Sequence, residues 1–149
     1  MKFSSTVITL AALLSISVAF PTSPTTVQPV RANSYYNNAT QSLNNVACSD
    51  GTNGLVTRGF STFDKLPTFP NIGAGYTVHN WNSSECGSCW KLTYAGTGVT
   101  IYAIAIDTVY SGFDLSEAAV GTLTLGNAGT SFSEIDVDSL EVDPSYCGL

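Results

Sequence analysis

The most regular alternation of apolar and polar residues lies just after the middle of the chain. Trp90, Leu92 and Tyr94 alternate with Lys91 and Thr93, which predicts a half-buried strand. After a turn at 95–98, residues 99–106 form a nearly continuous β-branched and aromatic run, which predicts a strand buried on both sides. We expect these two strands to pair as a hairpin.

Two further elements follow the hairpin. Ser116 is a plausible N-cap with Glu117 in the first turn, and Gly121 limits the predicted helix to one or two turns. The last strand is predicted at 133–142, where the apolar alternation slips by one residue near 138–139, which predicts a bulge or bend there.

The segment 59–81 breaks the pattern. It holds two prolines, three glycines and many aromatic residues, which excludes a long helix. We expect an ordered loop that turns its larger apolar side chains inward; these are Phe60, Phe63, Leu66 and Phe69. Short strands, one short helix and long loops predict a small β-barrel or sandwich.

The first 32 residues predict a secreted protein. Lys2, an apolar run at 7–18 and a small-x-small pattern ending at Ala19 are typical of a signal peptide, which we assign to 1–19. The proline-rich stretch 20–32 is predicted to be a flexible leader or pro-segment, so the domain is expected to span 33–149. No later segment approaches the length of a membrane-spanning helix.

The charge balance limits the classes of molecule that the protein is expected to bind. Without the signal peptide, four basic residues stand against eleven acidic ones, a net charge of −7. Nucleic acids and anionic membranes are poor partners for such a surface, whereas neutral polymers such as polysaccharides are suitable.

Four cysteines in a secreted chain predict two disulfides. Pairing Cys86 with Cys89 would close a tiny strained ring typical of redox catalysts, so we prefer Cys48–Cys86 with Cys89–Cys147. A thioredoxin-like redox centre would need a βαβ context, and the sequence shows no crossover helix that would provide one. A zinc site would need four suitably spaced ligands, but the chain has a single histidine, and we expect neither metal nor cofactor.

Two N-glycosylation sequons begin at Asn38 and Asn82. Both predict exposed backbone, and both asparagines are candidate glycan acceptors.

Several spaced motifs together resemble the cerato-platanin family of small secreted fungal proteins. The resemblance covers nearly all of residues 33–149 and rests on the four cysteines in register with these segments: Val46-Ala47-Cys48-Ser49-Asp50-Gly51, Phe69-Pro70-Asn71-Ile72-Gly73, Trp81-Asn82-Ser83-Ser84-Glu85-Cys86-Gly87-Ser88-Cys89-Trp90, Ile104-Ala105-Ile106-Asp107, Gly112-Phe113-Asp114 and Asp143-Pro144-Ser145-Tyr146-Cys147.

The resemblance implies a six-stranded double-psi β-barrel, the same disulfide pairing and a non-catalytic role. It also implies binding of chitin-type N-acetylglucosamine oligomers and other wall polysaccharides, expansin-like loosening of cellulosic material, self-assembly at interfaces and a place in the fungal cell wall. Elicitor activity through a host plant receptor is implied as well.

The expected site residues follow from the matched motifs. Asp50, Asp107 and Asp114 match family motif positions around a groove, and Tyr110 and Tyr35 are predicted to stack on sugar rings. Many relatives have Asn where this chain has Asp114, and the segment that begins at Phe113 is similar to the acidic motif of expansins and of endoglucanases on the same barrel.

Two alternatives stay open. One is an endoglucanase-like hydrolase with Asp114 as acid and Asp107 or Asp50 as its partner, because glycoside hydrolysis usually needs two carboxyl groups, about 6.5 to 9.5 Å apart for inversion. The other is a structural or interfacial wall protein with incidental sugar affinity.

Overall fold

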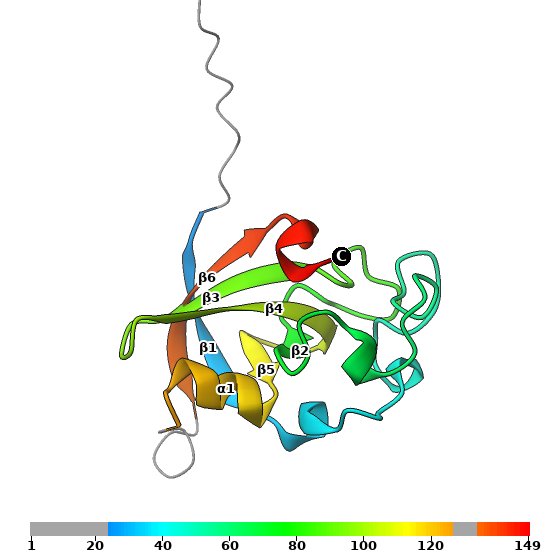
Figure 1. Cartoon of the computed structure of the whole chain (residues 1–149). Helices are drawn as coiled ribbons and strands as arrows, with labels where there is room; N and C mark the ends of the chain where they lie inside the picture. The colour runs from blue at the N-terminus through cyan, green and yellow to red at the C-terminus, as the bar shows by residue number, and fades with distance from the viewer. Residues whose placement is uncertain (1–23, 127–133) are drawn as a thin grey trace, which may run out of the picture.

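The chain folds into a closed six-stranded barrel with the strand order β1-β5-β2-β4-β3-β6 (Figure 1). The structure is a computed structural model, and it describes residues 24–126 and 134–149. The strands and the α-helix are β1 Thr26–Ala32, β2 Ile72–Gly75, β3 Cys89–Tyr94, β4 Val99–Thr108, β5 Phe113–Leu115, α1 Glu117–Leu123 and β6 Ile135–Val142. Short 3-10 helices lie at Ser34–Asn37 (η1), Leu43–Asn45 (η2), Phe63–Lys65 (η3) and Pro144–Cys147 (η4). The expected barrel is confirmed.

The predicted hairpin is confirmed as β3 and β4. The two strands pair in antiparallel register from Cys89 opposite Ile104 to Tyr94 opposite Val99, around the turn at 95–98. Four consecutive residues of β4, 103–106, are buried, as the continuous apolar run predicted. The hairpin contributes two adjacent walls of the barrel.

Aromatic rings fill the barrel interior near one end. The Phe113 ring meets the Trp90 ring edge to face with centroids 5.2 Å apart, and it meets Tyr76 at 5.7 Å. Such pairs add about 0.5–1.5 kcal/mol beyond the burial of their area. This cluster fixes β5 against β3, although β5 has only three residues.

The predicted flexible leader is wrong for residues 26–32, which form β1. This strand pairs in parallel with β5, where Val30 lies opposite Phe113, and in antiparallel with β6, where Gln28 lies opposite Val137. The sequence did not indicate this strand, because Val30 is the only residue of β1 that is fully buried and because Pro29 is unusual inside a strand. The ordered domain therefore begins before residue 33. The predicted signal peptide and residues 20–23 lie outside the described residues.

The bulge predicted near 138–139 in the last strand is also wrong. Strand β6 keeps a continuous register, with Ser139 opposite both Leu92 and Thr26. Ser139 continues the inward side of the alternation and is fully buried, and its hydroxyl donates to the Thr26 carbonyl oxygen at 2.8 Å. The apparent break in the apolar alternation is therefore a buried serine on the inward side of the strand, whose hydroxyl has a hydrogen-bond partner.

Helix α1 begins as predicted. The Ser116 hydroxyl oxygen accepts from the Ala119 amide at 3.0 Å, and Glu117 occupies the first turn. The same hydroxyl donates to the Pro70 carbonyl oxygen at 2.6 Å, which ties the helix to the long loop.

The long loop turns its apolar side chains inward as expected. Phe63 and Leu66 are buried, while Phe60 and Phe69 are partly buried against the core. The loop nevertheless contains β2, which was not predicted and lies between β4 and β5 with all four residues buried.

Both expected disulfides are present. Cys48 pairs with Cys86 and Cys89 with Cys147, with Cα atoms 5.2 and 5.8 Å apart. The first fastens the loop that follows η2, and the second holds η4 against the hairpin. Within the described ranges, no helix has the length and apolar character needed to cross a membrane.

Candidate functional site

A local irregularity in the sheet determines where Asp107 points. Along β2 and β4, Gly73 lies opposite Ala105, but the next residue, Ala74, lies opposite Asp107. Ile106 is therefore an extra residue in β4, and a bulge of this kind reverses the alternation of side chains beyond it. Asp107 consequently faces the same side of the sheet as Ala74.

The pairing continues across two more strands. Ala74 lies opposite Asp114 of β5, and Asp114 lies opposite Arg31 of β1. Since Asp114 lies between the buried Phe113 and Leu115, this side of the sheet faces away from the barrel interior, although Ala74 on it is only 1% exposed. We call Asp107, Ala74, Asp114 and Arg31 the acidic row; two strand spacings of about 4.8 Å place the Cα atoms of its carboxylates about 10 Å apart.

The Asp107 carboxylate is held by three donors. Its Oδ1 accepts from the backbone amides of Ala47 at 3.0 Å and Thr108 at 2.9 Å, and its Oδ2 accepts from the Tyr36 hydroxyl at 3.2 Å. Hydrogen bonds to a charged acceptor are about twice as strong as neutral ones. Asp107 thus has a fixed position and also anchors the loop that leads into Cys48.

Tyr36 belongs to this site although its neighbour Tyr35 was predicted instead. The Tyr36 side chain is only 4% exposed. Its burial, then the charge of Asp107 and the hydrogen bond to it, and then the charge of Asp114 raise the pKa of Tyr36 above its ordinary value. The hydroxyl therefore remains a proton donor within the field of both carboxylates.

Asp114 forms an ion pair at the other end of the row. The Arg31 Nε atom lies 2.7 Å from Asp114 Oδ1, its Nη1 lies 2.9 Å from Glu134 Oε2, and its Nη2 donates to the Ser111 carbonyl oxygen at 2.6 Å. The side chains of Arg31 and Asp114 are 31% and 27% exposed. One guanidinium thus holds two carboxylates in place.

The two predicted stacking residues lie in different places. Tyr35 is 38% exposed, and its ring meets Tyr36 edge-on at 5.3 Å, close to the acidic row. Tyr110 is fully exposed on the segment after β4. It lines an open groove of about 650 Å³, whose other lining residues are Tyr76, Val78, His79, Thr108 and Val109. Thr108 directly follows Asp107 along β4, but consecutive strand residues point to opposite sides of the sheet, so Tyr110 and this groove are not on the same face as the acidic row.

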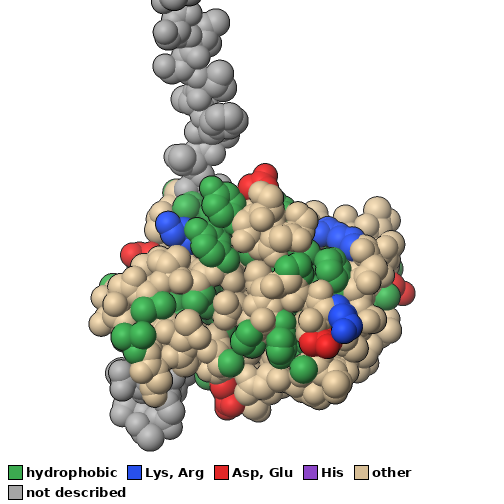
Figure 2. All heavy atoms as spheres, viewed as in Figure 1, with side chains coloured by type: hydrophobic (Ala, Val, Ile, Leu, Met, Phe, Trp, Pro, Cys, Tyr) green, Lys and Arg blue, Asp and Glu red, His purple; other side chains and the backbone are tan. Residues whose placement is uncertain are grey.

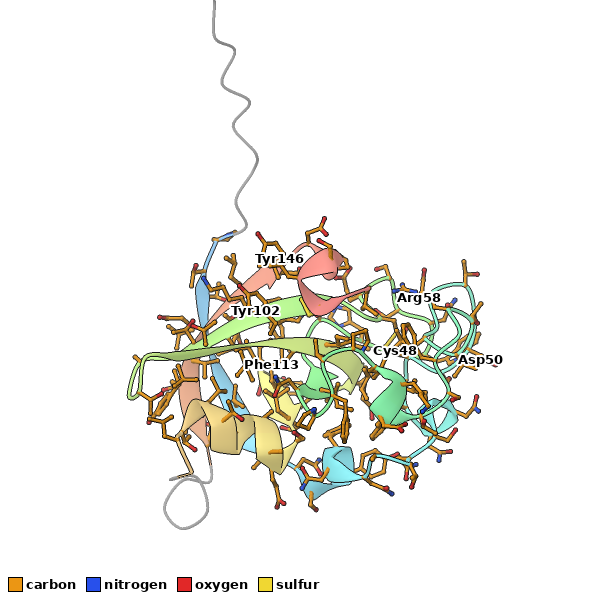
Figure 3. All side chains as sticks on the ribbon, in the orientation of Figure 1. Cys48, Asp50, Arg58, Tyr102, Phe113 and Tyr146 are labelled. Atoms are coloured by element: carbon orange, nitrogen blue, oxygen red, sulfur yellow. A yellow bond between two sulfur atoms is a disulfide. The ribbon has the colours of Figure 1, made fainter. Side chains whose placement is uncertain are left out.

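Asp50 is separate from the other two predicted aspartates. Its Oδ1 accepts from the Trp81 indole Nε1 at 2.7 Å, and this hydrogen bond lowers the pKa of the Asp50 carboxyl below its ordinary value. Figure 3 places Asp50 at the outer end of the loops, away from Phe113 in the barrel. The structure therefore brings Asp107 and Asp114 together but not Asp50.

The two sequons differ in their surroundings. Asn38 is exposed, and its Oδ1 accepts from the Thr40 hydroxyl at 3.1 Å. Asn82 is half-buried, with a positive φ of 60°, and its Oδ1 accepts from the Asn53 amide at 2.8 Å. Glycan occupancy at both stays a prediction. Within 24–126 and 134–149, the structure shows no group of three or more side chains that could hold a metal ion.

Comparison with known proteins identifies the family. The family model described as Cerato-platanin matches residues 29–149. The chain belongs to the cerato-platanin family. The match begins inside β1, in agreement with the ordered domain of the structure and not with the predicted start at 33.

Relatives and solved structures agree with this assignment. The chain is 45% identical over 76% of its length to a protein of Arthroderma benhamiae named Allergen Asp f 15 homolog, and it spans 55% of that relative. It is similar to the crystal structure of cerato-platanin 2 from M. perniciosa, with a TM-score of 0.78 and 43% identity over 83% of this chain and 100% of that one. The solution structure of the fungal elicitor cerato-platanin gives a TM-score of 0.68 with 31% identity, over 80% of this chain and 95% of that one. The cerato-platanin resemblance seen in the sequence is confirmed.

Proposed function

We propose that this chain is a secreted fungal wall protein that binds chitin-type or related wall polysaccharides along the acidic row and does not hydrolyse them. One observation carries the proposal: Asp107 and Asp114 lie on the same outer face of the barrel, each fixed by its own donors. Sugar hydroxyls are hydrogen-bond donors, and acceptors that are already in position lose little conformational entropy when they bind.

Aromatic side chains complete the binding surface in this proposal. Tyr35 lies beside the buried Tyr36, and Tyr110 lines the open groove that Thr108, the residue after Asp107, also lines. Their exposed rings offer apolar faces to pyranose rings. The face drawn in Figure 2 carries few charged side chains between large areas of uncharged atoms, which suits a neutral polymer.

The contacts of the two carboxylates favour binding over hydrolysis. A glycosidase needs one carboxyl group that carries a proton to the leaving oxygen and a second that stays free as base or nucleophile. Arg31 Nε already contacts Asp114 Oδ1 at 2.7 Å, and three donors already engage Asp107. Both carboxylates are therefore occupied by donors of the protein itself and neither is free to act as base or nucleophile, so the endoglucanase-like alternative is disfavoured.

The wider role is proposed from the disulfides and from the relatives. Two disulfides fit an oxidising extracellular compartment. One solved relative is described as a fungal elicitor and another relative is named an allergen homolog. We extend recognition by a host, expansin-like loosening and self-assembly at interfaces to this chain as parts of the same proposal.

Calorimetric titration with an N-acetylglucosamine hexamer tests the binding proposal. We expect Asp107→Asn and Asp114→Asn each to weaken binding roughly tenfold, since each loses a charged acceptor. Asp138→Asn is the matched control, because Asp138 is an exposed aspartate of β6 outside the row. If wild-type protein does not bind the hexamer or cellulose oligomers, the structural or interfacial alternative is favoured.

A reducing-sugar assay tests the absence of turnover. We expect no sustained release of reducing ends from chitin or β-glucan. Sustained release that Asp114→Ala abolishes would establish the hydrolase instead.

A further inference from the structure

Trp81 is an exposed aromatic residue that is nevertheless held in place. Its side chain is 58% exposed, and its indole Nε1 donates to Asp50 Oδ1 at 2.7 Å. An exposed indole gains little stability from burial, so packing does not account for its position. The hydrogen bond fixes one edge of the ring and leaves apolar ring surface open to solvent.

The two loops that carry these residues are joined beside them. The Asn53 amide donates to Asn82 Oδ1 at 2.8 Å, and Asn53 Nδ2 donates to the Asn82 carbonyl oxygen at 2.9 Å. The Cys48–Cys86 disulfide links the same two segments covalently. Trp81 and Asp50 are therefore preorganised, and a ligand that binds them pays little ordering entropy.

The chemistry of the pair is that of a cation site. An indole face attracts an ammonium group, and a carboxylate beside it adds a charge of opposite sign. The side-chain partners of Asp50 among the described residues are Trp81 and Ser49, so no cation of the described chain occupies it. Arg58 is directed elsewhere, since it donates to the Cys86 carbonyl oxygen at 3.2 Å.

We propose that Trp81 and Asp50 form a second binding site, for a protonated amino-sugar unit whose ammonium group pairs with Asp50 while its ring lies on the indole. A single open ring suits a flat pyranose better than a trimethylammonium group, which is bound by a cage of several rings. The side-chain amides of Asn53 and Asn82 supply polar groups beside the ring for hydroxyls. The chain's net charge of −6 also favours a cationic polymer over a neutral one at long range. This site is separate from the acidic row and does not rest on the function proposed for it.

The two tryptophans give a direct test. Trp90 is 4% exposed and donates to the Ser88 hydroxyl oxygen inside the fold, so its indole N–H signal serves as an internal reference. Nitrogen-15 spectra are recorded during titration with a β-1,4-linked glucosamine hexamer and with its fully N-acetylated counterpart, at a pH where the free amine is protonated. We expect the Trp81 indole signal to move with the amine hexamer, more weakly at high salt, while the Trp90 signal stays in place.

Asp50→Asn isolates the charge. An asparagine oxygen can still accept from the indole, so the ring keeps its position while the carboxylate charge is lost. We expect affinity at Trp81 for the amine hexamer to fall roughly fivefold to tenfold and the preference for the amine to disappear. Asp64→Asn, which changes an exposed aspartate of η3, should change neither.

Two results would overturn the proposal. One is equal movement of the Trp81 signal with the amine and acetylated hexamers, unaffected by Asp50→Asn. The other is no movement with either hexamer. If Asp50→Asn is unfolded by circular dichroism, Trp81→Ala replaces it in calorimetric titration, and unchanged affinity for the amine hexamer would then overturn the proposal.

Discussion

Replacing Tyr36 by phenylalanine removes the hydroxyl that donates to Asp107 at one end of the acidic row, and the adjacent Tyr35 supplies a matched control. The Tyr36 hydroxyl donates to Asp107 Oδ2 at 3.2 Å, whereas the Tyr35 hydroxyl approaches the Asn45 carbonyl oxygen only at 3.5 Å. The two substitutions delete the same atom from neighbouring residues. One of these hydroxyls has a charged partner and the other lies at an exposed position.

The expected cost follows from these contacts. A hydrogen bond to a charged group contributes about 1.5–3 kcal/mol, and Asp107 keeps its two backbone donors, so Tyr36→Phe should lower the free energy of unfolding by about 1–2 kcal/mol. For a domain of this size that corresponds to a fall in Tm of about 4–8 °C. Tyr35→Phe should cost less than about 0.5 kcal/mol, as expected for an exposed substitution.

Alkaline pH provides a second measurement. The pKa of Tyr36 is raised in the folded state, so the folded protein keeps a proton that the unfolded chain loses above its ordinary pKa of 10.0. The stability that this group contributes is complete below that pH and declines as the pH rises through it. Wild-type protein should lose about 1 kcal/mol between pH 10 and 11 from Tyr36 alone, and Tyr36→Phe should remove that loss.

Urea denaturation at pH 7, 10 and 11, followed by circular dichroism, measures both effects. The reasoning is refuted if Tyr36→Phe is no more destabilising than Tyr35→Phe at pH 7 and its alkaline slope equals that of wild type. In that case the Tyr36 hydroxyl does not hold Asp107.

Two further predictions concern other parts of the barrel. Burial first, and then the charge of Glu85, raise the pKa of Glu141 above its ordinary value. The contribution of Glu141 to folding stability is therefore complete below the ordinary pKa of a glutamate and is lost as the pH rises through the raised pKa of the folded state. Glu141→Gln should therefore add about 0.5 kcal/mol at pH 7 and nothing at pH 3 in urea denaturation, and an equal gain at both pH values would contradict this cause. Gly112 has a φ of 61°, and a Cβ there would collide with the Pro29 carbonyl oxygen, so Gly112→Ala should lower stability by about 3 kcal/mol. Gly98→Ala, at a φ of 73° with open space around the Cβ, should cost only about 1 kcal/mol, and equal losses for the two variants would show that the collision is relieved.

Short sequence patterns predicted those elements that are stabilised by residues close to them in the sequence. The alternation around Trp90 marked the hairpin, and Ser116 with Glu117 marked the start of α1, because pairing and capping depend on nearby residues. Strand β1 was missed because it has a single fully buried side chain, Val30, and its partners are more than 80 residues away. Such a strand is stabilised by its neighbours and not by its own sequence.

The site was predicted in part for a similar reason. Family motifs indicated Asp107 and Asp114, but simple alternation beyond Ala105 would have turned Asp107 into the barrel. Only the bulge at Ile106, which depends on the pairing with β2, turns it outward. The sequence also offered no means to tell the buried Tyr36 from its exposed neighbour, because both tyrosine rings contact the distant Phe63 and only the tertiary fold determines which ring is covered.

Chemical-shift mapping with an N-acetylglucosamine hexamer tests the central claim most directly. The amides of Ala47 and Thr108 donate to Asp107 Oδ1, so they should report any sugar hydroxyl that binds this carboxylate. The account predicts that the largest shifts appear at these two amides and around Asp114. Unchanged Ala47 and Thr108 signals, with shifts on the outer face of β6 around Asp138 or with no shifts at all, would contradict it.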